Sequence, residues 1–402
     1  MIEIWRSDEM KILYVYGMAK TRDIVVALRK MGYTVEEYGK IQSNSILDDK
    51  EIKELVNYIS KRKITHIMSI HLIYNLAVAA YRTDIKYISV IWDAPYLKPY
   101  TVMGKLDNVW YSVFDKLDCE RLKNSGFKHV LYQPLAVNRD NILKWNSKAK
   151  LNGQYISDIS FVANLYGNNL YDKQLQALPE NMQNYFISIF EEAAFHWDGV
   201  NRIYGKTSKE VLEYIKLVTP GLKFENPFDV EDVRYFEVAY LVRKLANIER
   251  ICILNMLAQH HKVYLYTDSI EAKEVLDGVS IGKPVLAGEP VSAIYAGSKI
   301  NLNISLKGIE GGTPQRIMDI MGAGGFVLTN YCSETAELFE ENKEIVMFKT
   351  PEELLEKVDY YLSHDEEREE IAEAGHKKVL QRYTYEHKMK QLMGWVENDE
   401  KD

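Results

Sequence analysis

Residues 298–330 constrain the fold of this chain more than any other stretch, and they read SKINLNISLKGIEGGTPQRIMDIMGAGGFVLTN. Ile300, Leu302 and Ile304 alternate with polar residues, which is the period of a half-buried strand. A glycine turn, a short amphipathic helix and a second apolar run follow, and the GAGG sequence at 322–325 ends the helix. The stretch therefore predicts a strand–helix–strand unit of a parallel sheet.

The predicted helix begins directly after the glycine turn. Thr313 suits the N-cap position, Pro314 suits the first helical position, and Gly311 and Gly312 allow a sharp turn with close approach to a ligand. A helix N-terminus presents unpaired N–H groups and the positive end of a dipole, so the turn is a candidate phosphate site. An ordinary strand–helix connection is the alternative, because isolated glycine turns are common.

Charged side chains flank this turn. Lys307 and Arg316 could supply positive charge to a phosphate. Asp319 lies one helical turn after Arg316 and could accept hydrogen bonds from sugar or ribose hydroxyls, with a solvated carboxylate as the alternative.

The first third of the chain alternates predicted strands with predicted helices. The strands are expected at residues 12–16, 33–38, 64–70, 86–92, 109–114 and 130–133. This α/β pattern predicts a mostly parallel, doubly wound sheet whose ligands lie beyond the carboxyl ends of its strands. The first strand–helix turn, residues 16–20, contains a single glycine, which argues against a classical NAD site.

The middle of the chain indicates a second domain with a helical insertion. Residues 137–152 are polar and are interpreted as the first crossing between domains, and a strand is expected at 158–163. Residues 170–260 are mostly helical by their periodicity, and we interpret them as an insertion packed on the second domain. A role of this insertion in acceptor recognition is left open. A last amphipathic helix is expected at 385–397.

Composition excludes several classes of function. The chain has 402 residues, enough for two domains, with 47 % hydrophobic and 27 % charged residues, as in ordinary globular proteins. A net charge of −8 argues against nucleic-acid and anionic-membrane surfaces. The 3 cysteines are scattered without metal or disulfide spacing, so a reducing cytoplasm is expected. We expect neither a signal peptide nor a membrane span of roughly 20 residues.

The stretch at 298–330 also resembles the C-terminal half of GT-B glycosyltransferases, in particular CgeB-like spore-maturation proteins. The resemblance extends to DISFVANLYG near residue 158, FDKLDCERLKNSGFKHVLYQPLAVN near residue 114 and the KVDYYLSHDEEREEIAEAGHKKV tail. In the retaining GT-B pattern, E-G-F-G leads to L-E-A-M-A-x-G; residues 310–312 resemble the turn and residues 318–324 the helix. Here Asp319 replaces the second glutamate and the acid-to-acid spacing is one residue longer, which leaves donor contacts and stereochemistry open.

The resemblance implies a GT-B architecture, with two Rossmann-like domains facing across a cleft. Residues 1–140 would form the acceptor-side domain, and residues 153–384 the nucleotide-sugar-binding domain, including the insertion at about 170–260. Residues 385–402 would form a helix that crosses back to the first domain.

The implied activity is metal-independent transfer of a sugar, of hexosyltransferase type, from a nucleotide-diphosphate sugar to a surface protein or glycan. A UDP-sugar is the default donor, and no cofactor or nucleic-acid partner is expected. Two alternatives remain open: a sugar-nucleotide epimerase of GT-B-like fold, and a non-catalytic spore or surface assembly protein.

Such a transfer needs charge at the leaving diphosphate, groups that hold the sugar and often a base. We expect Lys307, Arg316 and the N–H groups of the turn to bind the leaving diphosphate. We expect Asp319 to bind ribose or donor hydroxyls. Tyr266 and Thr267 end a strand and are either base contacts or plain strand-end residues. The candidate nucleotide-sugar-binding residues are Lys307, Glu310, Gly311, Gly312, Thr313, Arg316, Asp319, Tyr266 and Thr267.

Two residues at the ends of apolar strands are the candidate catalytic residues. Asp93 lies beside a turn fixed by Pro95, and a D-x-P turn also occurs in the CgeB-like branch. An Asx turn is the alternative for Asp93. His71 could face the same cleft, although a lone histidine at such a place is more often structural. A retaining enzyme would not require such a base.

Overall fold

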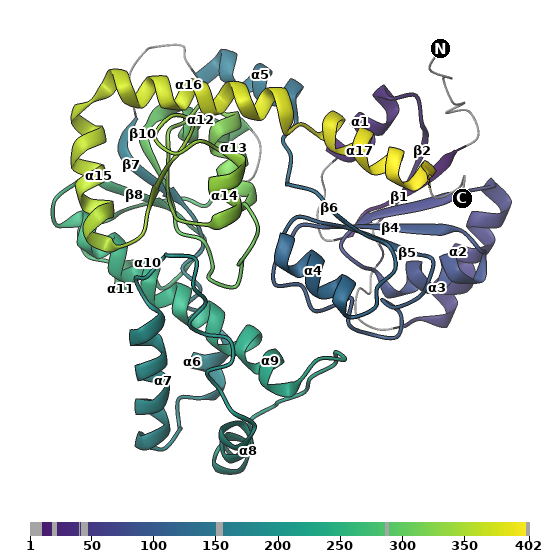
Figure 1. Ribbon diagram of the computed structural model, residues 1–402, viewed down its shortest axis with the longest axis horizontal. Coiled ribbons are helices and arrows are strands. Elements are labelled where there is room, and N and C mark those ends of the chain that lie inside the picture. The colour runs from purple at the N-terminus through teal and green to yellow at the C-terminus, as the bar shows by residue number, and fades with distance from the viewer. Residues whose placement is uncertain are drawn as a thin grey trace. The chain divides into compact units, whose positions relative to one another are not determined.

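The structure is a computed structural model that describes residues 10–17, 22–39, 41, 47–149, 156–285 and 289–398. The chain divides into two compact units (Figure 1). The first unit comprises residues 1–138, 227–229 and 383–402, and the second unit comprises residues 139–226 and 230–382.

The first unit is built on a parallel sheet with strand order β2-β1-β3-β4-β5-β6. Its strands are β1 (Lys11–Val15), β2 (Thr34–Tyr38), β3 (His66–Ile70), β4 (Lys86–Ile91), β5 (Val109–Val113) and β6 (Val130–Tyr132). Its helices are α1 (Asp23–Lys30), α2 (Asp49–Arg62), α3 (Tyr74–Arg82), α4 (Lys116–Asn124) and α17 (Tyr385–Asn398). The strand order reverses between β1 and β3, so their carboxyl ends flank a crevice.

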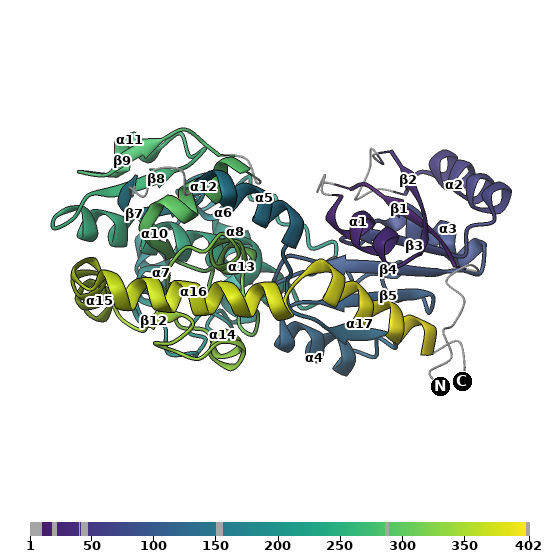
Figure 2. The ribbon, with the colours of Figure 1, turned by 90° about the horizontal axis from the view of Figure 1, so that it is seen from above.

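Helices cover both faces of this sheet, which is why β3 and β5 are buried along their whole length. On one face, α17 packs beside α1 (Figures 1 and 2). The predicted return of the last helix to the first domain is thus confirmed. The buried hydrophobic side chains of α17 are Tyr385, Met389, Leu392, Met393 and Val396.

The second unit contains a parallel sheet with strand order β12-β11-β10-β7-β8-β9. Its strands are β7 (Ser157–Val162), β8 (Val263–Tyr266), β9 (Ser280–Gly282), β10 (Ser298–Asn303), β11 (Val327–Asn330) and β12 (Val346–Phe348). Its helices outside the insertion are α5 (Arg139–Ala149), α11 (Ala272–Val275), α12 (Glu289–Gly297), α13 (Gln315–Gly322), α14 (Ser333–Leu338), α15 (Pro351–Ser363) and α16 (Asp365–Arg382). Here the order reverses between β7 and β10. None of the helices in the described ranges is both long and apolar enough to cross a membrane.

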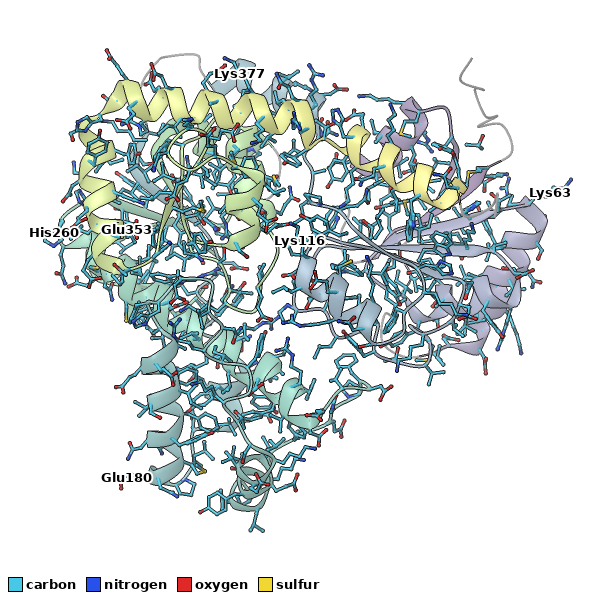
Figure 3. All side chains as sticks on the ribbon, viewed as in Figure 1. Lys63, Lys116, Glu180, His260, Glu353 and Lys377 are labelled. Atoms are coloured by element: carbon cyan, nitrogen blue, oxygen red, sulfur yellow. The ribbon has the colours of Figure 1, made fainter. Side chains whose placement is uncertain are left out.

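The region between β7 and β8 is helical, as predicted. It contains α6 (Leu170–Gln174), α7 (Glu180–Ala193), α8 (Lys209–Val218), α9 (Asp232–Phe236), the π-helix η1 (Glu237–Leu241) and α10 (Val242–Ala258). Glu180 marks the end of α7 that lies away from the sheet of its unit (Figure 3). Phe186, Phe236 and Tyr240 belong to a hydrophobic core of its own, so the region is a folded insertion.

The predicted half-buried character of β10 is wrong. Asn301 and Asn303 are both buried, because α12 and α13 pack against β10 as well as α15. Asn301 accepts a hydrogen bond from Ser160 Oγ at 3.0 Å and donates one to the Tyr295 carbonyl oxygen at 2.9 Å. The polar residues that alternate with apolar ones along β10 therefore form hydrogen bonds inside the protein and do not face water.

The predicted start of α13 is also shifted by one residue. Pro314 occupies the N-cap position with an extended backbone, and the helix begins at Gln315. Thr313 is not the cap, because it is buried with its hydroxyl 3.1 Å from that of Thr335. At the other end, Gly325 has the Tyr295 carbonyl oxygen 2.6 Å from the position of a Cβ, so only glycine fits there.

Candidate functional site

The loop after β10 and the first turn of α13 bring most of the predicted donor-site residues together. Gly311 and Gly312 are buried and keep φ outside the left-handed region. Pro314 has no side-chain group that could cap the first-turn N–H groups. The Ile317 N–H donates to the Pro314 carbonyl oxygen at 3.0 Å, and a helix N-terminus whose N-cap residue supplies no side-chain acceptor is suited to an anionic group.

Arg316 is held beside this N-terminus by β10. One guanidinium nitrogen donates to Asn303 Oδ1 at 2.9 Å, and the guanidinium carbon lies 5.3 Å from the centre of the Phe161 ring on β7. The Asn303 amide donates in turn to the hydroxyls of Ser305 and Thr329, each at 2.9 Å. A positive charge is thus positioned where the strand order of this sheet reverses.

The remaining polar candidates lie to either side. Asp319 is partly exposed and accepts a hydrogen bond from Gln315 Nε2 at 2.7 Å. Tyr266 ends β8 and Thr267 follows it, and β7 separates that strand from β10. The Thr267 hydroxyl accepts from the Ser269 N–H at 3.0 Å.

Lys307 lies in the predicted loop, but its ammonium group has protein partners. It donates to the carbonyl oxygens of Ala193 and His196, the latter at 2.8 Å, and lies 3.1 Å from Glu249 Oε1. Glu249 is fully buried, and Phe195 N–H donates to the same oxygen. Burial raises the pKa of the Glu249 carboxyl and lowers the pKa of Lys307, while their mutual attraction opposes both shifts.

A second buried cation joins the two strands at the reversal point. Arg250 donates to the carbonyl oxygens of Asn164, after β7, and Ile304, after β10, the latter at 2.7 Å. Burial lowers the pKa of this guanidinium to about 10. Sequence reasoning missed Glu249 and Arg250. The available signal was two adjacent charges within the apolar repeat of a long helix.

A small pocket opens at this edge of the second unit, with a cavity volume of about 50 Å³, and it is partly open to solvent. Three segments line it: the segment between α7 and α8, the loop after β10 and the loop after β11. The lining residues are His196, Trp197, Gly199, Val200, Asn201, Ser305, Leu306, Lys307, Ile309, Glu310, Gly312, Asn330, Tyr331, Cys332 and Ser333.

In the first unit, the two candidate catalytic residues lie side by side. His71 follows β3 and Asp93 follows β4, and Nε2 of the histidine is 3.2 Å from Oδ2 of the carboxylate. The Asp93 side chain is 72 % exposed, whereas that of His71 is 21 % exposed. His71 has a φ of 62°, an uncommon conformation for a non-glycine residue, and its ring centre lies 4.9 Å from that of Tyr96.

The protonation of His71 depends on its surroundings. Burial lowers its pKa, Asp93 opposes this effect and Lys98 adds to it. Lys98 donates to the Leu72 carbonyl oxygen at 3.1 Å, and burial lowers the pKa of its ammonium group to about 8. Sequence reasoning did not single out Lys98, because no local motif marks it.

Known proteins resemble this arrangement of elements. Residues 255–394 match the model of a protein family described as glycosyl transferase-like. A glycosyltransferase from Rickettsia africae aligns with a TM-score of 0.51 at 12 % identity, over 97 % of this chain and 98 % of that chain. HepE from Anabaena, in complex with UDP-glucose, gives 0.51 at 9 % identity, over 96 % and 99 %. The chain has a glycosyltransferase-like GT-B fold.

A protein of similar fold is described with a different activity. A UDP-GlcNAc 2-epimerase from Neisseria meningitidis, bound to UDP-GlcNAc, aligns with a TM-score of 0.50 at 11 % identity, over 97 % of this chain and 100 % of that chain. No curated protein matches the sequence. Because the structural matches have such low identity, the GT-B likeness concerns the fold alone, and the CgeB-like assignment stays a prediction.

The family match includes the elements that surround the uncapped helix, from β8 through α13 to α17. Among the residues that the structure describes, no three or more His, Cys, Asp or Glu side chains lie together in a way that could hold a metal ion.

Proposed function

We propose that the chain is a glycosyltransferase that moves a sugar from a nucleotide-diphosphate sugar to a protein or glycan acceptor. The observation that carries this proposal is the uncapped N-terminus of α13, with Arg316 fixed beside it by Asn303. The family match over residues 255–394 supports the same class of activity. HepE, a protein of similar fold, was solved with UDP-glucose, and a UDP-sugar is accordingly the donor we propose first.

In this proposal, the donor diphosphate binds the first-turn N–H groups of α13 and the guanidinium of Arg316. Negative charge grows on the diphosphate as the glycosidic bond to it breaks, and fixed dipoles and a fixed cation stabilise that charge without reorganising. Asp319, one turn further along α13, accepts hydrogen bonds from ribose hydroxyls, and Tyr266 and Thr267 contact the base. Lys307 holds the loop in its conformation and does not contact the donor, since Glu249 and two carbonyl oxygens bind its ammonium group.

The first unit supplies the base in this proposal. Asp93 is the exposed member of the pair, so its carboxylate is the group that can take a proton from an acceptor hydroxyl. His71 donates from Nε2 to Asp93 and positions it. Its Nδ1 is buried without a hydrogen-bond partner among the described residues, which suits an unprotonated nitrogen.

Titration calorimetry with UDP, GDP, CDP, ADP and dTDP, with and without Mg²⁺, tests the donor site. One nucleoside diphosphate should bind, and Arg316→Ala should weaken it by about tenfold or more, because a charge-assisted contact is worth about 1.5–3 kcal/mol. Arg382→Ala, at an exposed arginine in the last turn of α16, is the matched control and should bind normally. Unchanged affinity in Arg316→Ala would remove this arginine from the site.

An epimerase is the second candidate, because an epimerase is among the proteins of similar fold. Incubation of the donor without acceptor, followed by NMR, separates the two activities. Formation of a second nucleotide sugar would indicate epimerisation, whereas transfer requires the acceptor and releases the nucleoside diphosphate.

A further inference from the structure

The loop that carries the glycine turn is attached to the helical insertion near its start. The Lys307 ammonium group lies 3.1 Å from Glu249 Oε1 on α10 and donates to the His196 carbonyl oxygen at 2.8 Å. The side-chain amide of Asn201 donates to the Lys307 carbonyl oxygen at 3.4 Å. Leu306 packs against the hydrophobic core of the insertion. The insertion therefore fixes the first residues of this loop.

Arg234 attaches the insertion to the same loop at a second point, directly before the two glycines. It lies on α9, and its Nη2 is 3.8 Å from Glu310 Oε2. The Glu310 side chain is 13 % exposed and that of Arg234 is 24 % exposed, so solvent screens this ion pair less than a pair on the open surface. Gly311 and Gly312 follow Glu310 in the chain, and both are buried. Arg234 thus holds the residue at which the glycine turn begins.

The insertion also holds Arg234 itself in place. Its guanidinium carbon lies 3.4 Å from the centre of the Tyr204 ring, a stacked arrangement that suits the flat guanidinium group. Asn201 Oδ1 accepts from the Tyr204 N–H at 2.9 Å, which fixes the backbone below the ring. In η1, directly after α9, Glu237 accepts from the Thr207 N–H at 3.1 Å. These contacts fix both the ring and the helix that carry the guanidinium.

A turn that contains two glycines depends on such anchors. Glycine has no side chain and loses more conformational freedom on ordering than other residues. After the glycines, the Thr313 hydroxyl lies 3.1 Å from that of Thr335. The turn is thus held at both ends, by Arg234 through Glu310 before the glycines and by Thr335 after them. A turn that is ordered before the ligand arrives loses little conformational entropy on binding.

We propose that Arg234 is a positioning residue for the donor. Through Glu310 it keeps the glycine turn in the conformation that leaves the first-turn N–H groups of α13 open to the diphosphate. This inference rests on the proposed function, which places the diphosphate at that helix. Arg234 acts through Glu310 and not by touching the donor. The insertion, which is distant in sequence from the glycine turn, then contributes to donor affinity.

A double-mutant cycle on nucleoside diphosphate affinity tests this role. Calorimetry compares the wild type with Arg234→Met, Glu310→Gln and the variant that carries both changes, with UDP, GDP, CDP, ADP and dTDP as probes. Each single variant should bind about fivefold more weakly, because the turn must then be ordered as the ligand binds. The double variant should bind no more weakly than either single variant, since both changes remove the same contact.

The insertion contains a matched control for this cycle. Lys216 on α8 also lies over an aromatic ring, 4.6 Å from the centre of Phe224, and it also pairs with a carboxylate, Asp232 Oδ2 at 3.0 Å. Lys216→Met therefore removes a similar pair from the same insertion without changing the glycine turn, and its nucleoside diphosphate affinity should match the wild type. Urea unfolding of each variant without ligand separates a loss of stability from a loss of affinity.

Four outcomes would overturn the inference. Wild-type affinity in Arg234→Met or in Glu310→Gln would show that the turn does not depend on this pair. Losses that multiply in the double variant would show that the two residues act independently. An equal loss of affinity in Lys216→Met would assign the effect to the stability of the whole insertion.

The cycle stays decisive if one variant fails to fold. Glu310→Gln leaves Arg234 stacked on Tyr204, so it gives a reading even if Arg234→Met does not fold. In each outcome above the wild type still binds a nucleoside diphosphate, so the proposed function stands. A wild type that binds none of the probes would overturn both the proposed function and this inference.

Discussion

Among single residues, Asp93 has the clearest expected effect on turnover. Asp93→Asn should lower the transfer rate by about 100-fold or more, because an amide cannot accept the acceptor's proton. Donor affinity should stay unchanged, since the diphosphate contacts are on α13. Steady-state turnover and calorimetry measure the two quantities. Asp107→Asn, at an exposed carboxylate 2.7 Å from Lys128, is the control, and a normal rate in Asp93→Asn would end its candidacy as the base.

Lys98 should influence the pH at which the pair of His71 and Asp93 loses activity. Burial lowers the pKa of His71 below the usual 6.5 and Lys98 lowers it further, while Asp93 opposes both, so the imidazole takes up its proton at a lower pH than an exposed histidine does. Lys98→Met removes a positive charge, and the pKa of His71 should rise. The acidic limb of the rate–pH profile should therefore move to higher pH, whereas Lys105→Met should leave it in place. An unmoved limb in Lys98→Met would show that His71 does not control the rate.

The lowered pKa of His71 also predicts how the free energy of unfolding depends on pH. Below pH 6.5 an unfolded histidine binds a proton that the folded His71 resists. The free energy of unfolding should therefore fall as pH drops below 6.5, and Lys98→Met should reduce that loss. Urea unfolding at pH 7.5 and 5.5 measures both.

Among the elements, α13 offers a substitution with opposite effects on stability and binding. Pro314→Asp places a good N-cap side chain on the uncapped first turn and should stabilise the fold by about 0.5–1 kcal/mol. The same carboxylate would occupy the proposed diphosphate site and repel it, so nucleoside diphosphate affinity should fall by about tenfold or more.

The chain contains a matched control for this change. Pro179 is the N-cap residue of α7, also with an extended backbone and no capping side chain, and it lies beside Glu180 at the end of α7 away from the sheet. Pro179→Asp should stabilise in the same way and leave binding unchanged. Equal affinity in the Pro314→Asp and wild-type proteins would show that the diphosphate lies elsewhere. Urea unfolding and calorimetry provide the two readings.

The sequence predicted those elements whose cause is local. The period of apolar residues marked β1, β7, α10 and α17, because one buried face is enough to produce it. It did not reveal β9, whose strand is Ser280–Gly282 and too short for a period. It also misread β10, because whether Asn303 faces water depends on neighbouring strands that lie far away in the sequence.

In the candidate site, too, the sequence predicted the features with a local cause and missed those that depend on distant segments. The positions of Arg316 and Asp319 follow from helix spacing within one motif. Tertiary packing between distant segments brings Glu249 to Lys307, and it brings Lys98 close enough to His71 to lower its pKa. Local patterns carry no information about such pairs, so the sequence could name candidate charges without showing which of them are available to a ligand.

For the whole molecule, the first unit contains both ends of the chain. Residues 1–138 form its sheet, and α17 within 383–402 covers one face of that sheet. Leu392 and Met393 are fully buried there, in a hydrophobic cluster that includes residues of α1 and β1. Without α17, a contiguous apolar face of the sheet would be exposed to water, at a cost of about 25 cal/mol per Å².

This dependence predicts how fragments behave. Residues 1–138 alone should lack a cooperative thermal transition, whereas residues 1–138 joined by a flexible linker to 383–402 should unfold cooperatively. Calorimetry and circular dichroism distinguish the two. The linked fragment with Leu392→Asp and Met393→Asp is the control, because it keeps the length and should lose the transition, since a buried charge costs several kcal/mol. A cooperative transition in residues 1–138 alone would show that the sheet is stable without α17.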